Sequence, residues 1–201
     1  MQAWAVTKSS WWDSWISSLD ERTQDEAIML RKQLRQLGVE HPDEWVRSEI
    51  SENQAQVARY RLLRGLWSAE INSWRDKVDT WIANTRRELN RRPTGPFSDG
   101  GKALLRLVDE LGATQEEIGA LARMIAYETV FGVLYQLDDS DITEDDITIP
   151  VDLLNELPSW ALIEVRGEDG EPTGRTIQGL HESLLSMDPS GRDGRPATRS
   201  E

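Results

Sequence analysis

Glu128 is the residue of this chain whose surroundings most favour chemistry. It lies within "LARMIAYETVFGVLYQL", a segment that is otherwise almost wholly apolar. A helical wheel gives it apolar neighbours on both sides, with Leu121 and Gly132 on one side and Met124, Phe131 and Tyr135 on the other. An unpaired carboxylate in apolar surroundings has a raised pKa, which is the property of a general acid. A structural ion pair with Arg64 or Arg75 explains the same residue more simply. The sequence favours the ion pair and leaves catalysis open.

His181 is the second candidate, because a His-Glu pair on a helix invites comparison with the zinc-protease motif. That motif requires a further histidine four residues later, where this chain has Leu185. A histidine beside an apolar stripe is more often a hydrogen-bonding residue at the edge of the core. The chain has no cysteine, which excludes disulfides, thiolate nucleophiles and cysteine-ligated metals. Walker A, G-x-G-x-x-G and G-x-S-x-G motifs do not occur either.

An acidic run follows the apolar segment. Its six acids are Asp138, Asp139, Asp141, Glu144, Asp145 and Asp146. The run is not an EF-hand loop, because Glu144 stands where that loop needs glycine and Pro150 stands where it needs its last ligand. The favoured interpretation is a solvent-exposed segment that contacts a basic partner. A weak divalent-ion site with Asp139, Asp141 and His181 as ligands is the alternative.

The charge of the chain limits its partners. The net charge of −13 opposes binding to nucleic acid. The acidity belongs to the second half, because residues 1–95 carry fifteen Lys or Arg and fourteen Asp or Glu, whereas residues 96–201 carry eight and twenty-two. No basic start with an apolar run behind it occurs, nor an uninterrupted apolar stretch of about 18 residues. We therefore expect a cytoplasmic protein with no membrane span and no cofactor.

Three tryptophans spaced seven residues apart form a stripe on a long predicted helix. Trp67, Trp74 and Trp81 fall with their apolar neighbours within an arc of about 100°, opposite a charged face. Such an arc is typical of a helix packed on a globular core. Either the whole stripe is covered by this chain, or one end is bare. Trp81, nearest to a Pro- and Gly-rich loop at 91–101, is the end that a partner would contact.

Shorter patterns predict the elements of the N-terminal half. A stripe at i, i+3, i+4 and i+7 is expected to dock on the core, and its members are Trp12, Trp15, Ile16 and Leu19. A capping box predicts that a helix begins at Thr23, and Gly38 and Pro42 mark the end of that helix and the start of the next. The helical pattern from residue 43 to residue 92 is too long for a compact domain, and Ser51 is the expected break.

The sequence of the C-terminal half predicts two more helices, followed by a segment with a strand-like pattern. Helices are expected at 98–111 and 115–137, with a capping box at Thr114, and the second is apolar nearly all round, which is typical of a central, buried helix. Strands at 159–165 and 175–178 flank a glycine-rich turn, and a closing helix is expected at 177–187.

Together these patterns predict a mainly α fold. Residues 1–147 are expected to form a bundle of about five helices, with loop 91–101 within it. Residues 148–188 are expected to form a small β-hairpin-plus-helix appendage, and residues 189–201 a disordered tail.

The function expected from these features is protein–protein binding. The acidic second half, the aromatic content and the lack of a complete catalytic motif favour an inhibitor or immunity-like protein, an adaptor or an assembly subunit. The expected contact residues are Trp81 and the acidic run, and the partner is a protein, basic if the run is the contact. The alternative is a metal-dependent enzyme on a helical bundle, with Glu128, His181 and residues 138–146 at its centre. The pattern does not decide whether this is an enzyme, and it gives no oligomeric state.

Overall fold

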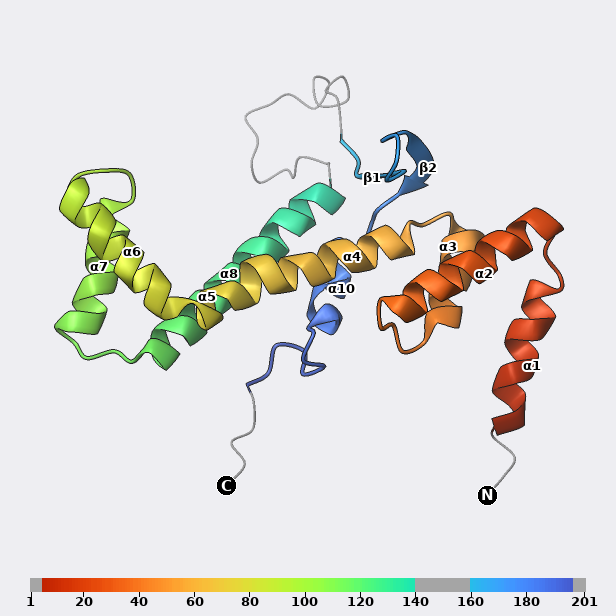
Figure 1. Cartoon of the computed structure of the whole chain (residues 1–201), viewed down its shortest axis with the longest axis horizontal. Coiled ribbons are helices and arrows are strands. Elements are labelled where there is room, and N and C mark those ends of the chain that lie inside the picture. Colours follow the sequence, from red (N-terminus) through yellow and green to blue (C-terminus); the bar gives the residue numbers. More distant parts are fainter. Residues whose placement is uncertain (1–4, 140–159, 197–201) are drawn as a thin grey trace, which may run out of the picture. The chain divides into compact units, whose positions relative to one another are not determined.

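The computed structural model describes residues 5–139 and 160–196, with side chains from residue 11 onward (Figure 1). Its contacts divide the chain into two compact units, unit 1 (residues 1–61 and 137–180) and unit 2 (residues 62–136 and 181–201). The fold is mainly α-helical with one small antiparallel hairpin in the C-terminal part, as predicted. The predicted domain boundary at residue 147 lies outside the described residues, and the domain limits stay a prediction.

Unit 1 contains the first helices of the chain, and local signals set their ends. Asp20 caps the second helix by accepting a hydrogen bond from the Thr23 amide at 3.1 Å. The predicted capping box at Thr23 is therefore wrong, because the aspartate three residues earlier is the better cap. Gly38 has the left-handed φ of 81° expected after a helix, and Pro42 occupies a first helical turn. The helices are α1 (Ala5–Ile16), α2 (Glu21–Gln36), α3 (Pro42–Glu52) and the start of α4 (Gln56–Leu66).

The core of unit 1 forms where these helices bury their apolar faces. Trp12 is 5% exposed and packs with Ala27, Leu30, Leu34 and Val46. The other members of the predicted N-terminal stripe pack against the same cluster, and they are Trp15, Ile16 and Leu19. The predicted docking of the N-terminal tryptophans on the protein's own core is confirmed.

The hairpin of unit 1 joins β1 (Ile163–Val165) to β2 (Pro172–Thr176) in antiparallel order. The predicted hairpin is confirmed, but its second strand begins three residues before the predicted strand at 175–178. Thr176 also forms a parallel bridge with Gln54, and its carbonyl accepts a hydrogen bond from the Ala55 amide at 3.1 Å. The hairpin is thus attached by its backbone to the segment between α3 and α4.

Unit 2 begins in the second half of α4 and continues through a series of helices. The long helical pattern of the sequence breaks at Asn53, which has a φ of 55°, and again at Lys77, which has a φ of −127° and a ψ of 26°. The predicted break at Ser51 is therefore two residues too early, and the break at Lys77 was not predicted. The elements of unit 2 are η1 (Trp67–Ile71, a π-helical turn), α5 (Asn72–Asp76), α6 (Val78–Arg91), α7 (Ser98–Asp109), α8 (Gln115–Asp138), most of α10 (Leu180–Leu184) and the 3₁₀ turn η3 (Leu185–Met187).

Helix α8 begins as predicted, but it is not a buried helix. Thr114 and Glu117 form the expected capping box, because the Glu117 amide donates to Thr114 Oγ1 at 3.2 Å and the Thr114 amide donates to Glu117 Oε2 at 2.8 Å. The fully buried residues of the helix are Ile118, Gly119 and Leu134. Its other face carries large apolar side chains that are about half exposed, namely Leu121, Met124, Ile125, Val133 and Tyr135. The prediction of a central helix is wrong, because the described elements cover one side of α8 only.

The same helix has an unusual composition for one so exposed. Among the described helices, α8 alone has the length and the mean hydropathy, 1.3, of a candidate membrane span. Of the 18-residue stretch of α8 with that hydropathy, 17% is buried. Arg123 and Glu128 interrupt its apolar run. The finding rests on length and composition.

Residues 188–196 form a series of turns held by polar contacts. Asp188 accepts hydrogen bonds from the amides of Ser190 at 2.9 Å and Gly194 at 2.8 Å. Arg123 of α8 donates to the Gly194 carbonyl at 3.1 Å and lies 3.8 Å from the Asp188 carboxylate. The predicted disorder of residues 189–201 is therefore wrong for residues 189–196, because a buried aspartate orders these turns.

Candidate functional site

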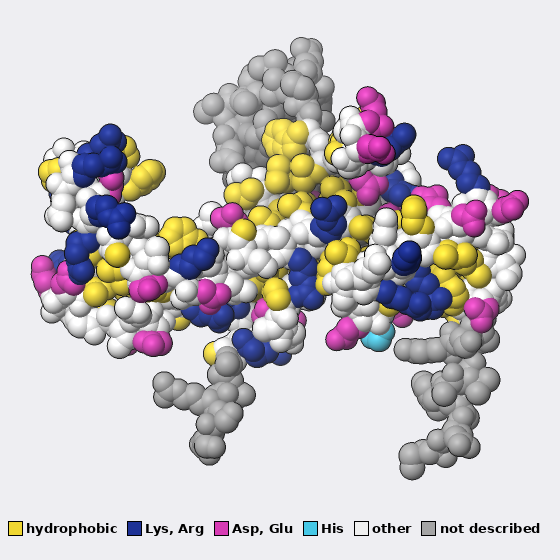
Figure 2. Space-filling view, viewed as in Figure 1, with side chains coloured by type: hydrophobic (Ala, Val, Ile, Leu, Met, Phe, Trp, Pro, Cys, Tyr) yellow, Lys and Arg dark blue, Asp and Glu magenta, His cyan; other side chains and the backbone are white. Residues whose placement is uncertain are grey.

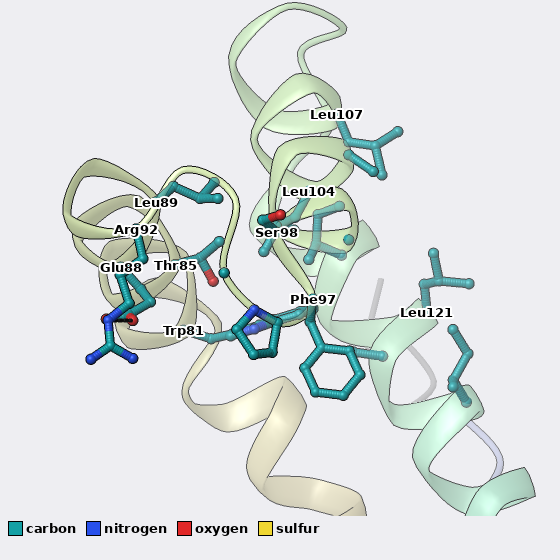
Figure 3. Close-up of a pocket in the computed structure, with 18 residues that line it drawn as sticks. Trp81, Thr85, Glu88, Leu89, Arg92, Phe97, Ser98, Leu104, Leu107 and Leu121 are labelled. Carbon is teal, nitrogen blue, oxygen red and sulfur yellow. Dashed lines mark ion pairs between the residues drawn. The ribbon is translucent and has the colours of Figure 1, made fainter.

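Unit 2 contains an apolar groove. It consists of two adjoining hollows of about 500 and 480 Å³, which share Trp81, Ala122 and Ile125 as lining residues. Helices α6, α7 and α8 enclose the first hollow, and η1, α5 and α8 enclose the second. Figure 3 shows the first hollow, with Trp81 and Phe97 on one side and Leu121 on α8 across from them. We call the two hollows together the apolar groove.

Two glycines set how closely the walls of the groove approach. A Cβ atom on Gly101 of α7 would lie 3.1 Å from Thr85 Cγ2 on α6. A Cβ atom on Gly119 of α8 would lie 2.8 Å from Val78 Cγ2, and its second neighbour is the backbone of Arg75 at 3.2 Å. A Cβ on Gly119 would force its neighbours to shift, whereas one on Gly101 would need Thr85 to give way by a few tenths of an ångström. Gly119 therefore limits the helix spacing more strictly than Gly101 does.

A small core lies beneath the groove. Its buried residues are Val78, Ile82, Leu104 and Ile118. Leu104 and Ile118 also line the groove, so the floor belongs to the core of unit 2. Side chains that are already packed in a core lose less conformational freedom on binding, which lowers the free-energy cost of ordering the surface.

The tryptophan stripe enters this groove at its exposed end. Trp67 is 1% exposed, and its indole N–H donates to the Leu184 carbonyl at 2.7 Å. Trp74 is 39% exposed, and its ring meets the half-buried ring of Trp81 edge-on, with 5.1 Å between centroids. One end of the stripe is therefore covered by this chain, and the other end is partly bare.

Phe97 stands at the mouth of the groove in an uncommon conformation. Its side chain is 89% exposed and its φ is 58°, in the left-handed region that bulky residues rarely adopt. The tight loop after α6 imposes this φ, since the Gly95 amide donates to the Arg92 carbonyl and the Ser98 amide to the Gly95 carbonyl, each at 3.1 Å. Strain held beside a hollow is typical of binding sites.

Charged groups of the groove lie on its rim. Glu88 forms ion pairs with Arg91 at 2.9 Å and with Arg92 at 3.9 Å at one end. Glu70 lines the other end, and no described residue forms an ion pair with it. The rest of the lining is mainly carbon, so the described groove offers a surface for apolar binding and no pair of titratable groups for acid–base catalysis.

Glu128 does not occupy the position that the sequence predicted. It is exposed, and within the described residues it forms no ion pair, while Arg75 pairs with Asp76 at 3.1 Å. The apolar residues on either side of it are themselves uncovered, so the carboxylate keeps its contact with water. The hypothesis of a buried general acid is wrong, and so is the hypothesis of a structural ion pair with Arg64 or Arg75.

His181 lies partly buried against two aromatic rings of α8. Its ring is edge-on to Phe131 at 5.7 Å and to Tyr135 at 5.1 Å. Within the described chain no group of three histidines or acids could hold a metal ion. Asp138 and Asp139 are half-buried at the end of α8. The other predicted contact residues lie outside the described residues, namely Asp141, Glu144, Asp145 and Asp146.

The sequence did not predict a buried charge cluster in unit 1. Glu49 of α3 is fully buried, accepts a hydrogen bond from the Val57 amide at 3.1 Å and lies 3.2 Å from Arg175 of β2. Arg175 also pairs with Glu26 of α2 and lies 3.7 Å from Glu164 of β1. Burial raises the pKa of Glu49 to about 7, against the opposing effects of the Val57 amide and Arg175. We call these four residues the carboxylate–arginine cluster.

The sequence contains one signal that could have predicted this cluster, a glutamate on the apolar face of a helix. Glu49 follows Pro42 and Val46 at helical spacing on the buried face of α3, so a carboxylate was placed in an apolar stripe. Its partner Arg175 is far away in the sequence, in a strand, and no local pattern connects the two.

Comparisons of the chain with models of protein families, with curated proteins and with solved structures find no match.

Proposed function

We propose that this protein binds another protein, by accepting the apolar face of an amphipathic helix in the apolar groove. The observation that carries the proposal is an apolar groove with exposed aromatic residues at its edge, Trp74 and Phe97. Aromatic side chains beside an apolar hollow are the usual anchors of protein–protein interfaces. Monomeric proteins rarely leave connected apolar surface of this kind uncovered.

The dimensions of the groove favour a helix as its occupant. Its lining follows α8 from Ile118 to Val130, which corresponds to about 18 Å at about 1.5 Å per residue. That length equals about three helical turns, and an amphipathic helix of three turns presents anchors at i, i+3, i+4 and i+7. A small polar ligand fits less well, because such ligands need several converging polar groups to fix their orientation.

The acidic part of the chain supports a partner with positive charge. Residues 137–180 contain twelve Asp or Glu and two Arg, so most of the net charge of −13 belongs to this stretch. Such a field accelerates the approach of a basic protein and weakens with salt. An inhibitor, an adaptor and an assembly subunit would all use this kind of surface. The metal-dependent enzyme considered above gains no support from the exposed position of Glu128.

A peptide of about 16 residues with leucines at i, i+3, i+4 and i+7 tests the proposal. Titration into the whole protein, followed by calorimetry, is expected to give saturable binding in the micromolar range. A scrambled peptide of the same composition, with leucines spread round the helix, is the matched control and is expected to bind at least tenfold more weakly.

A blocked groove completes this test. Ala122 lines both hollows, so Ala122→Trp is expected to fill the groove and to abolish binding of the amphipathic peptide. Ala83→Trp, at an exposed position of α6 that lines neither hollow, controls for the added indole. Equal binding of both peptides, or full binding by Ala122→Trp, would contradict the proposal.

A further inference from the structure

The exposed face of α8 continues the apolar groove and has one charged group near its middle. Leu121 and Ile125 line the groove and are 46% and 53% exposed. Glu128 stands three residues after Ile125, and Gly132 and Tyr135 continue the same face. Figure 2 shows hydrophobic side chains gathered over α8. A helix seated along this surface would therefore cover a carboxylate among apolar groups.

Covering that carboxylate has a physical cost. An ionised group that loses water without gaining a partner destabilises the complex. Within the described chain no cation pairs with Glu128, and its aromatic neighbour Tyr127 has a pKa raised by burial and by the charge of Glu128. A helix seated on this face can supply the compensating cation.

We infer that the helix bound by the groove carries one Lys or Arg within its apolar stripe, positioned to pair with Glu128. This inference rests on the proposed function, since it specifies the partner of the same surface. A second copy of this chain is a poorer occupant. Two α8 helices related by a twofold axis at the middle of this face would place one Glu128 against the other, and like charges oppose such a pair.

A charge-reversal cycle tests the inference directly. Two amphipathic peptides are used, identical except for a central Lys or a central Glu within the leucine stripe. Both are titrated into the whole protein and into Glu128→Lys, which is expected to fold because Glu128 is exposed. The wild-type protein is expected to bind the Lys peptide about tenfold more tightly than the Glu peptide, and Glu128→Lys is expected to reverse this preference. Glu116→Lys, an exposed change in the first turn of α8, is the matched control and keeps the wild-type preference.

The outcomes separate the two proposals. Binding of both peptides with equal affinity, or the same preference in wild type and Glu128→Lys, overturns the pairing with Glu128 and leaves the groove as a binding site. Binding of neither peptide overturns the proposed function as well. A concentration-dependent dimer of the free protein, broken by Leu121→Ser, would overturn the inference in favour of a second copy.

Discussion

Units 1 and 2 are both built from amphipathic helices, but they differ in how far the apolar faces of those helices are covered. In unit 1 the N-terminal tryptophan Trp12 is 5% exposed, and a fully buried glutamate is held in the carboxylate–arginine cluster. In unit 2 Trp74 is 39% exposed, and the charged Glu128 lies at the surface. Unit 1 has α1 and the hairpin to close over its helices, whereas no described element covers the outer face of α8. The comparison teaches that an apolar stripe becomes core or binding surface according to what the chain places on it.

The largest expected effect on stability comes from removing the cation of the carboxylate–arginine cluster in unit 1. Arg175→Met leaves Glu49 buried without its cation, so we expect the free energy of unfolding of unit 1 to fall by about 3–5 kcal/mol at pH 8. Hydrogen exchange at the amides of Leu30 and Leu34 measures this loss in the core of unit 1. Arg166→Met, in the exposed turn of the hairpin, is the control and should change the free energy of unfolding of unit 1 by less than about 0.5 kcal/mol. A similar small change for Arg175→Met would show that the cluster does not stabilise unit 1.

Raising the pH should destabilise unit 1 through the buried carboxyl of Glu49. The folded-state pKa of Glu49, about 7, lies above its ordinary value of 4.5, so the folded state binds the proton more tightly. The resulting stability is complete below pH 4.5 and is lost as the pH rises towards 7. We expect a loss of about 3 kcal/mol between pH 4.5 and pH 8. Glu49→Gln should lose this pH dependence, whereas Glu52→Gln, which is exposed on the same helix, should keep it. Equal pH profiles for wild type and Glu49→Gln would contradict the assignment.

Two glycines of α8 test the spacing of the groove walls. Gly119→Ala places a Cβ 2.8 Å from Val78 and should destabilise unit 2 by about 1–3 kcal/mol. The Cβ atom that Gly132→Ala adds has no neighbour within 4 Å, so this substitution should stabilise the same helix by up to about 1 kcal/mol. Thermal unfolding of both variants gives the comparison. Equal effects of the two substitutions would show that Gly119 does not set the helix spacing.

The smallest expected effect on stability is at the groove itself. Ile125 is 53% exposed, so Ile125→Ser should change the free energy of unfolding by less than about 0.5 kcal/mol while weakening peptide binding at least tenfold. Leu104→Ala, in the floor and 6% exposed, is the contrasting variant and should cost about 2–5 kcal/mol. A large loss of stability for Ile125→Ser would place this residue in the core and remove it from the binding surface.

Local signals in the sequence predicted much of the fold. The capping box of Thr114, the left-handed Gly38 and the docking of Trp12 depend on residues close in the chain or on one helix face, and the structure confirms all three. The bend at Lys77 has no such signal, because neither glycine nor proline marks it.

The candidate site was predicted only in part. Trp81 was chosen because it ends the tryptophan stripe, and it lies in the groove. The sequence predicted Glu128 in a buried helix. Hydrophobicity shows which helix faces favour burial, but it does not show whether another element of the chain packs on them. The contact between Glu49 and Arg175 depends on how the hairpin packs on α3, and residue spacing carries no information about that packing.

The indole N–H signals of the protein provide the most direct test of the binding surface. The chain has nine tryptophans, and a two-dimensional nitrogen–proton spectrum separates their signals. On addition of the Lys-containing amphipathic peptide, the signals of Trp74 and Trp81 should shift, while those of Trp12 and Trp67, which are buried, should stay in place. A shift of Trp12 without a shift of Trp81, or no shift of any indole at saturating peptide, would contradict the assignment of the groove as the binding site.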